Sequence, residues 1–334
     1  MAWHDAHKQR GPRFLLRLFI VITIALVWSA LAGALCIAAA QEPDEVVRVR
    51  TDLVTVPLIV TDSRARRIPD LKTEDFTLAD DNRAAKIDDV ASGTGRAAML
   101  FALDAAGSGR EIIAQQREAA LALYSRFGHG SRVAVLQFAN FVRLSVPFTT
   151  DSVAAQASFN FEASASGGTG IFDGAAAAAR SFDGSGGFSM ERRIVVLISD
   201  GLDTLSSTKY ADVIAVARAR GVSFYVIHSL LFTPRDGRLA PRSPSKGFRE
   251  LAEHTGGRYF RVGDAKSSLD PRAHYDLAPV FQAIEDDLRG QYVLGFYPGS
   301  AARDGQTHSV TVNLANRNRK LKVNQLRTTY NLKP

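Results

Sequence analysis

The sequence predicts an α/β fold, in which a doubly wound, mostly parallel sheet is flanked by β-rich segments. Between residues 97 and 290, continuous apolar runs alternate with stretches whose apolar residues recur at helical spacing. Such alternation implies β-α-β crossovers, which place helices on both faces of a parallel sheet. Before and after this region, apolar and polar residues alternate with the two-residue period of half-buried strands.

The N-terminus predicts export from the cytoplasm. Residues 1–17 are basic, residues 18–40 are apolar, and this run ends in three alanines before Gln41. This is the pattern of a signal peptide, although the run is long enough to remain as an N-terminal membrane anchor. We therefore expect a periplasmic, secreted or membrane-anchored protein, with membrane contact only if residues 1–40 are retained.

The single cysteine and the modest charge exclude two classes of protein. Cys36 lies inside the apolar segment, so cleavage after Ala40 would leave no cysteine and hence no disulfide framework. The formal net charge of +7 falls to +4 once the four basic residues and one acidic residue of 1–40 are removed. An excess this small does not predict nucleic-acid binding.

The β-rich ends enclose the central region. Residues 46–95 are expected to form a small β-rich domain, with strands within 46–61, 75–81 and 84–92. Three more strands are expected after the central region, within 291–298, 308–316 and 320–330, in a C-terminal segment of residues 291–334. The sequence leaves two arrangements open: the two ends pack together, or the C-terminal strands extend the central sheet.

The central region, residues 96–290, contains the elements of a doubly wound sheet. Strands are expected at 97–104, 131–140, 141–148, 192–200, 222–230 and 258–262. Helices are expected at 110–127, 151–160, 171–182, 208–221, 247–257 and 276–290, and residues 234–245 are expected to be a polar loop. Ligands of such sheets bind beyond the carboxyl ends of the strands, where Asp104 and Asp200 follow two apolar runs.

Three segments converge on this edge and carry a resemblance to a known family. LDAAGSGR (103–110), SGGTGIFDG (166–174) and ISDGLDT (198–204) together resemble the metal-ion-dependent adhesion site of a von Willebrand factor type A (VWA) domain. The family pattern is Asp-x-Ser-x-Ser, a threonine in a later glycine-rich loop, and an aspartate followed by glycine. The residues that match it are Asp104, Ser108, Thr169 and Asp200. The middle serine of the first motif is replaced by Ala106.

The resemblance extends to the β-rich ends. LVTVPLIVTD (53–62), LKTEDF (71–76), QYVLGFYP (291–298) and KLKVNQLRTTY (320–330) are similar to segments of exported bacterial VWA-related proteins. The resemblance to this family implies an adhesion-type module that binds a protein partner through a divalent cation, which would be Mg²⁺ or alternatively Mn²⁺ or Ca²⁺.

Oxygen ligands of this kind suit a hard divalent cation, which also tolerates water in its coordination sphere. An ion held largely by neutral hydroxyls stays electrophilic and can accept an acidic side chain from a partner. Ala106 removes one hydroxyl ligand, so the site is partly degenerate. Asp173 and Asp203 lie near the same edge as possible helpers.

Other interpretations remain open at this point. Asp104, Asp200 and Ser108 could cap helices or turns, and the chain could be a structural scaffold of the cell envelope that binds no metal. An enzyme is not expected, because the G-x-S-x-G, G-x-x-x-x-G-K-[ST] and H-E-x-x-H motifs are all absent from the sequence.

Overall fold

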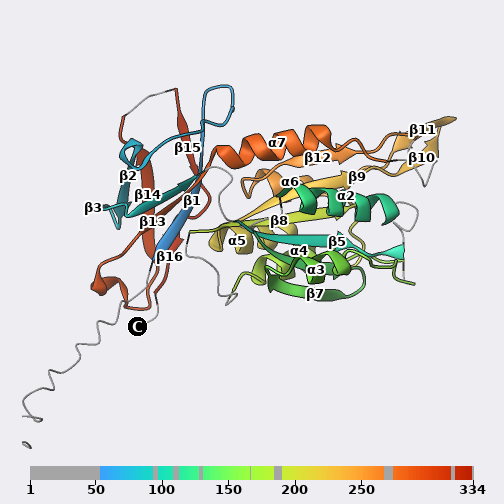
Figure 1. Ribbon diagram of the computed structural model, residues 1–334, viewed down its shortest axis with the longest axis horizontal. Coiled ribbons are helices and arrows are strands. Elements are labelled where there is room, and N and C mark those ends of the chain that lie inside the picture. Colours follow the sequence, from blue (N-terminus) through green and yellow to red (C-terminus); the bar gives the residue numbers. More distant parts are fainter. Residues whose placement is uncertain are drawn as a thin grey trace, which may run out of the picture. The chain divides into compact units, whose positions relative to one another are not determined.

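Figure 1 shows the computed structural model of the chain. The structure describes residues 53–92, 97–107, 113–127, 131–165, 167–183, 190–266, 274–316 and 320–332, which all fall within one compact unit, Asp52–Pro334. The signal or anchor expected at residues 1–40 lies outside the described residues. Within those ranges, none of the helices combines the length and apolar character that crossing a bilayer requires.

A six-stranded sheet forms the centre of the fold, with the strand order β12-β9-β8-β5-β6-β7. Its strands are β5 (Ala97–Asp104), β6 (Arg132–Phe138), β7 (Val142–Thr149), β8 (Arg192–Ser199), β9 (Val222–Ser229) and β12 (Tyr259–Val262). All neighbouring pairs are parallel except β6 and β7, which are antiparallel. The predicted doubly wound, mostly parallel sheet is therefore confirmed, with one antiparallel strand at its edge.

Helices cover both faces of this sheet (Figure 1). The helices α2 (Ile113–Phe127), α3 (Ser152–Ser158) and α7 (Ala278–Arg289) pack on one face, and α4 (Ile171–Arg180), α5 (Tyr210–Ala219) and α6 (Phe248–Glu253) pack on the other. Alternate residues of β5 supply the two cores: Phe101 faces the first group and Leu100 the second. Burial on both faces explains why β5 is apolar without interruption.

The β-rich ends of the chain pack together, which was the first of the two arrangements that the sequence left open. One antiparallel sheet has the order β15-β1-β13-β4, and a second has the order β16-β14-β2-β3. Their strands are β1 (Val54–Thr61), β2 (Phe76–Asp80), β3 (Arg83–Ala85), β4 (Asp89–Ser92), β13 (Gln291–Phe296), β14 (His308–Leu314), β15 (Lys322–Gln325) and β16 (Thr329–Tyr330). Both sheets contribute to a common apolar core, so together they form a β-sandwich built from both ends of the chain.

Two local predictions need correction. Residues 84–92 are not one strand: they are divided between β3 and β4, which belong to different sheets. Residues 234–245 are not an irregular loop, because β10 (Phe232–Arg235) and β11 (Arg238–Pro241) form an antiparallel hairpin. Its turn residues, Asp236 and Gly237, have φ angles of 50° and 75°. Asp-Gly is a favoured sequence for such two-residue turns, and this signal outweighs the polar character of the segment.

A buried ion-pair network joins the sandwich to the central region. Asp287 of α7 is fully buried, and its carboxylate accepts hydrogen bonds from Arg67 Nε at 2.7 Å and Arg67 Nη2 at 3.0 Å. Arg258 Nε and the Tyr225 hydroxyl donate to the same carboxylate at 3.1 and 3.2 Å. Arg67 follows β1, so this network fixes the segment between the first two strands of the sandwich against α7.

Candidate functional site

The carboxyl ends of β5 and β8 bring two aspartates to one edge of the sheet. Asp104 is the last residue of β5 and is 3% exposed, and Asp200 directly follows β8 and is 1% exposed. Parallel pairing of β5 with β8 makes these strand ends neighbours. The sequence-predicted pair of carboxylates is thus adjacent in the fold and almost inaccessible to solvent.

Asp104 is held by hydrogen bonds to both of its oxygens. The Ala106 backbone N–H donates to Oδ1 at 2.9 Å, and the Ser199 hydroxyl donates to Oδ2 at 2.6 Å. Ser199 Oγ in turn accepts from the Gly201 N–H at 3.0 Å. Burial, together with the negative charge of Asp200, nevertheless raises the pKa of Asp104 to about 7, against the lowering effect of these hydrogen bonds.

Asp200 has one oxygen in use and one that is unpaired. Its Oδ1 accepts from the Leu202 N–H at 2.9 Å, while its Oδ2 is buried and has no hydrogen-bond partner among the described residues. Burial raises the pKa of Asp200, and the Leu202 hydrogen bond and the Arg242 guanidinium act in the opposite direction. A buried carboxylate oxygen without a partner is costly in free energy, so this oxygen is available to bind a cation.

Thr169 lies in the glycine-rich segment before α4 and is 1% exposed. Its carbonyl accepts from the N–H groups of Thr204 and Leu205 at 2.9 and 3.0 Å, and its own N–H donates to Thr204 Oγ1 at 2.9 Å. The next residue, Gly170, donates its N–H to the Ala139 carbonyl at the end of β6. The glycine-rich segment is therefore fixed between the end of β6 and the segment that follows Asp200.

The structure describes Ala106 of the first motif but not Ser108. Ala106 is 1% exposed and provides a backbone N–H to Asp104, so its side chain offers no oxygen at a buried position. Ser108 lies outside the described residues, and its part in the site stays a prediction from the sequence.

The two possible helpers, Asp173 and Asp203, hold the first turn of α4. Asp203 Oδ1 accepts from the Ile171 N–H at 2.7 Å, which makes it an N-terminal cap supplied by another segment. Asp173 accepts from the N–H groups of Ser207 and Thr208 at 3.0 and 2.9 Å. Both carboxylates are thus engaged in fixing α4 against the segment after β8.

One residue that the sequence analysis did not single out is central to this edge. Ser199 is fully buried and connects Asp104 to Gly201 by two hydrogen bonds. The signal was present, because Ser199 is the polar residue that ends the apolar run of β8 immediately before Asp200. Because buried hydroxyl groups are seldom without a partner, this position predicts a hydrogen bond between Ser199 and a neighbouring strand end.

The residues present suit a hard divalent cation with several water ligands. The described residues contain no cluster of three or more histidine, cysteine, aspartate or glutamate side chains that could hold a metal ion. The metal-ion-dependent adhesion site that the sequence resembles needs only two carboxylates, because hydroxyl groups supply its other protein ligands. The unpaired Asp200 Oδ2 and the raised pKa of Asp104 both suit a positive ion bound between the two acidic groups.

Comparisons with known proteins agree with this architecture. The family model described as "von Willebrand factor type A domain" matches residues 99–272. No protein among the curated sequences matches.

Solved structures that match this chain include bacterial and animal proteins. The conserved hypothetical protein BatB from Bacteroides thetaiotaomicron has 19% identity, with 57% of this chain and 98% of that chain covered and a TM-score of 0.44. A von Willebrand factor type A protein from Catenulispora acidiphila has 13% identity, coverage of 84% and 74%, and a TM-score of 0.45. Proximal thread matrix protein 1 from the mussel byssus, with a zinc-occupied MIDAS motif, has 15% identity, coverage of 61% and 48%, and a TM-score of 0.44.

Proposed function

The chain belongs to the von Willebrand factor type A family, and from this premise we propose that it is an extracytoplasmic protein-interaction module. In this proposal it binds an acidic side chain of a partner protein through a divalent cation at the edge formed by β5 and β8. Asp104, Asp200, Thr169 and Ser108 would hold the ion, with water in the position left by Ala106. When bound, the ion supplies an electrophilic coordination position that a partner carboxylate can occupy.

The observation that carries this proposal is the pair of buried, interacting carboxylates. Two like charges in a low-dielectric environment repel each other, and one oxygen of Asp200 has no partner among the described residues. Ser199 and the Ala106 N–H fix the Asp104 carboxylate, so its oxygens are oriented before an ion arrives. A divalent cation would offset the repulsion that these residues otherwise retain.

The alternative is a scaffold protein of the cell envelope that uses the same fold without metal. Two observations favour it: Ala106 lacks the ligating hydroxyl, and both oxygens of Asp104 already accept hydrogen bonds. In that case the Asp104–Ser199–Gly201 chain of hydrogen bonds is a structural network of the strand ends. Neither alternative is an enzyme, because the sequence lacks the nucleophile, nucleotide and zinc-protease motifs.

Extracytoplasmic location is part of the proposal and depends on residues 1–40. A basic start followed by a long apolar run directs a chain out of the cytoplasm, whether or not the run is cleaved. Sequencing the N-terminus of the protein recovered from the envelope and culture fractions tests it. A mature N-terminus at Gln41 identifies a signal peptide, and an intact N-terminus in the membrane fraction identifies an anchor. Recovery from the cytoplasm alone would contradict export.

Titration of the purified protein with Mg²⁺ and Mn²⁺ separates the two functions. The metal-dependent function predicts heat of binding in calorimetry and a higher unfolding temperature at millimolar ion. Ala106→Ser should tighten binding because it restores a hydroxyl ligand; a gain of about tenfold would correspond to about 1.4 kcal/mol. Absence of heat and of any thermal shift in both proteins would leave the metal-independent scaffold.

Ala105→Ser is the matched control for this titration. Ala105 is the neighbouring residue, and its side chain packs in the apolar core beneath the sheet. A serine there adds the same hydroxyl but directs it away from the carboxylates, so ion affinity should not increase. If both serine variants tighten binding equally, the effect does not come from a restored ligand.

A further inference from the structure

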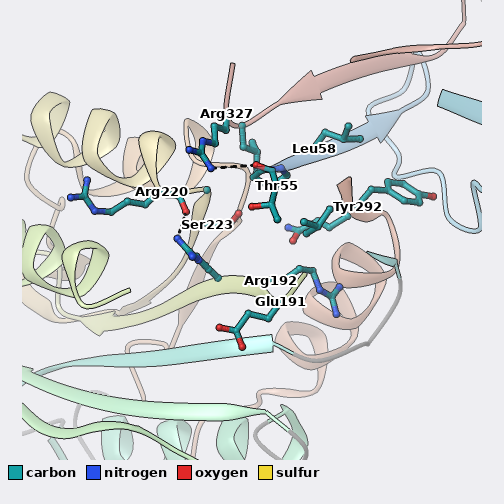
Figure 2. Close-up of a pocket in the computed structure, with 14 residues that line it drawn as sticks. Thr55, Leu58, Glu191, Arg192, Arg220, Ser223, Tyr292 and Arg327 are labelled. Atoms are coloured by element: carbon teal, nitrogen blue, oxygen red, sulfur yellow. Dashed lines mark hydrogen bonds between the residues drawn. The ribbon is translucent and has the colours of Figure 1, made fainter. Parts of the chain in front are cut away.

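A second charged region lies at the opposite end of β8. Here β1, the starts of β8 and β9, β13 and the segment after β15 surround a cavity that encloses about 430 Å³, part of it open to solvent (Figure 2). Little of this space lies deep between the side chains, so the cavity suits a small ligand at its open side rather than a large enclosed one.

Arginines supply most of the charged groups in the lining of this cavity. Its charged residues are Glu191, Arg192, Arg193, Arg220 and Arg327. Glu191, the one carboxylate in this lining, is already paired with Arg132, which is not a lining residue. Arg220 is paired with Asp183, with its Nη2 2.6 Å from Oδ2. These two ion pairs are neutral, so the excess positive charge comes from the remaining arginines.

Arg193 and Arg327 are oriented by backbone carbonyls. Arg193 Nη1 donates to the Arg220 carbonyl at 3.1 Å. Arg327 Nε donates to the Thr329 carbonyl at 3.0 Å, and its Nη1 donates to the Thr55 carbonyl at 3.4 Å (Figure 2). Within the part of the chain that the structure describes, neither guanidinium forms an ion pair with a carboxylate.

Both guanidiniums are also in an unfavourable electrostatic environment. Burial lowers the pKa of Arg327, and the neighbouring charge of Arg193 lowers it further. Burial likewise lowers the pKa of Arg193; Glu191 and Asp183 act against this, and the charges of Arg132 and Arg220 act with it. Two partly desolvated cations close to each other favour an anion between them.

We propose that this cavity binds a small tetrahedral oxyanion with two negative charges, of the phosphate or sulfate class, between Arg193 and Arg327. Guanidinium groups present planar arrays of N–H donors that suit paired hydrogen bonds to such oxygens. Two unpaired positive charges match a dianion better than a monocarboxylate. The limited room selects the free ion over a bulky phosphate ester.

The bound ion would join two parts of the fold. Arg193 belongs to β8 of the central sheet, and Arg327 follows β15 of the sandwich. An oxyanion that contacts both therefore stabilises the packing of the sandwich against the central sheet. Binding should appear as increased stability of the folded protein.

Thermal unfolding of the purified protein with inorganic phosphate tests the proposal. At about 10 mM phosphate we expect the unfolding temperature to rise by about 3 °C relative to sodium chloride of equal ionic strength. Sulfate should have the same effect, and acetate should have none. No increase beyond the chloride control would overturn the proposal.

Variants locate the effect within the molecule. Arg327→Gln and Arg193→Gln should each abolish the phosphate shift, and Arg327→Lys should reduce it, because an ammonium keeps the charge but loses the paired donors. Arg218→Gln is the matched control, since Arg218 is an exposed arginine of α5 outside the cavity lining. A phosphate shift that survives in Arg327→Gln, or that disappears in Arg218→Gln, would place binding elsewhere and reject the site.

The same variants distinguish an ion site from a structural role of the arginines. If the guanidiniums serve only to bond the Thr55 and Arg220 carbonyls, Arg327→Gln and Arg193→Gln lose stability with and without phosphate by the same amount. If they bind an oxyanion, each variant loses more stability in the presence of phosphate than in its absence, because only the parent is stabilised by the bound ion. Calorimetric titration with phosphate then gives the affinity directly.

Discussion

The two ends of β8 carry charges of opposite sign, and at each end the charged side chains lack an ion-pair partner among the described residues. At its carboxyl end, Asp104 and Asp200 are buried next to each other, and one carboxylate oxygen is without a partner among the described residues. At its amino end, the charge of Arg193 adds to burial in lowering the pKa of Arg327. At each end, charges of one sign lie near each other in an environment of low dielectric constant, where their repulsion costs more free energy than it does in water. The comparison suggests that each end is completed by an ion of opposite charge.

In the Asp287 network of the same molecule, a buried charge has partners of the opposite sign. Arg67 and Arg258 both donate to the Asp287 carboxylate, and Tyr225 adds a further hydrogen bond. Here the chain supplies both signs of charge and no ligand is needed. The Asp287 network therefore differs from the two ends of β8 in having charged partners within the chain, since the aspartates are buried and the two arginines are partly buried.

Breaking the completed network should have the largest effect on stability. Asp287→Asn leaves the Arg67 guanidinium, whose side chain is 13% exposed, without its carboxylate. Loss of one partner of a buried ion pair costs about 3–5 kcal/mol, and urea unfolding should show a loss of this size. Glu285→Gln on the same helix is the control, because Glu285 pairs with Arg126 and Arg289 at the surface. Equal losses in the two variants would show that the buried network contributes no more than a surface pair.

The acidic end should make stability depend on pH and on divalent ions. The pKa of Asp104 is about 7 in the folded protein, above its ordinary value of 3.8. Between these values the folded state holds a proton that the unfolded chain has lost, so stability should fall as pH rises from about 4 to 7. At 1.36 kcal/mol per unit of pKa, the largest possible loss is about 4 kcal/mol.

Urea unfolding at several pH values, with and without Mg²⁺, checks this prediction. Mg²⁺ should stabilise the protein at pH 8, where Asp104 is ionised, and should have no effect at pH 5, where a proton occupies it. Asp104→Asn should remove this part of the pH dependence together with the Mg²⁺ effect. Stability that rises between pH 5 and 7 in the parent relative to Asp104→Asn would contradict the raised pKa.

The central sheet was predictable from the sequence because burial on both faces leaves a clear pattern. The predicted strand 97–104 coincides with β5, and the helix predicted from residue 151 begins there, because Asp151 accepts hydrogen bonds from the Val153 and Ala154 N–H groups. The adjacency of Asp104 and Asp200 followed from the rule that parallel strands end at one edge. These inferences needed only local sequence and the fold class.

What the sequence could not predict depends on contacts between distant segments. The arginine-lined cavity brings Arg193 of β8 beside Arg327, and only the pairing of β1 with both β13 and β15 places them together. The helper role of Asp203 was a reasonable inference from its position near Asp200. Its actual partners, the N–H groups at the start of α4, became visible only in the structure.

Asp203 therefore provides the smallest and most selective test of the acidic end. Asp203→Ala removes the cap of α4 and should cost about 1 kcal/mol in urea unfolding. Asp151→Ala, which removes the cap of α3, is the matched control and should cost a similar amount. Because Asp203 already accepts hydrogen bonds from α4, its loss should leave Mg²⁺ affinity within about twofold of the parent, whereas Asp200→Asn should abolish binding. A tenfold loss of Mg²⁺ affinity in Asp203→Ala alone would instead make Asp203 part of the ion site, and the acidic end would then hold three participating carboxylates where the structure shows two.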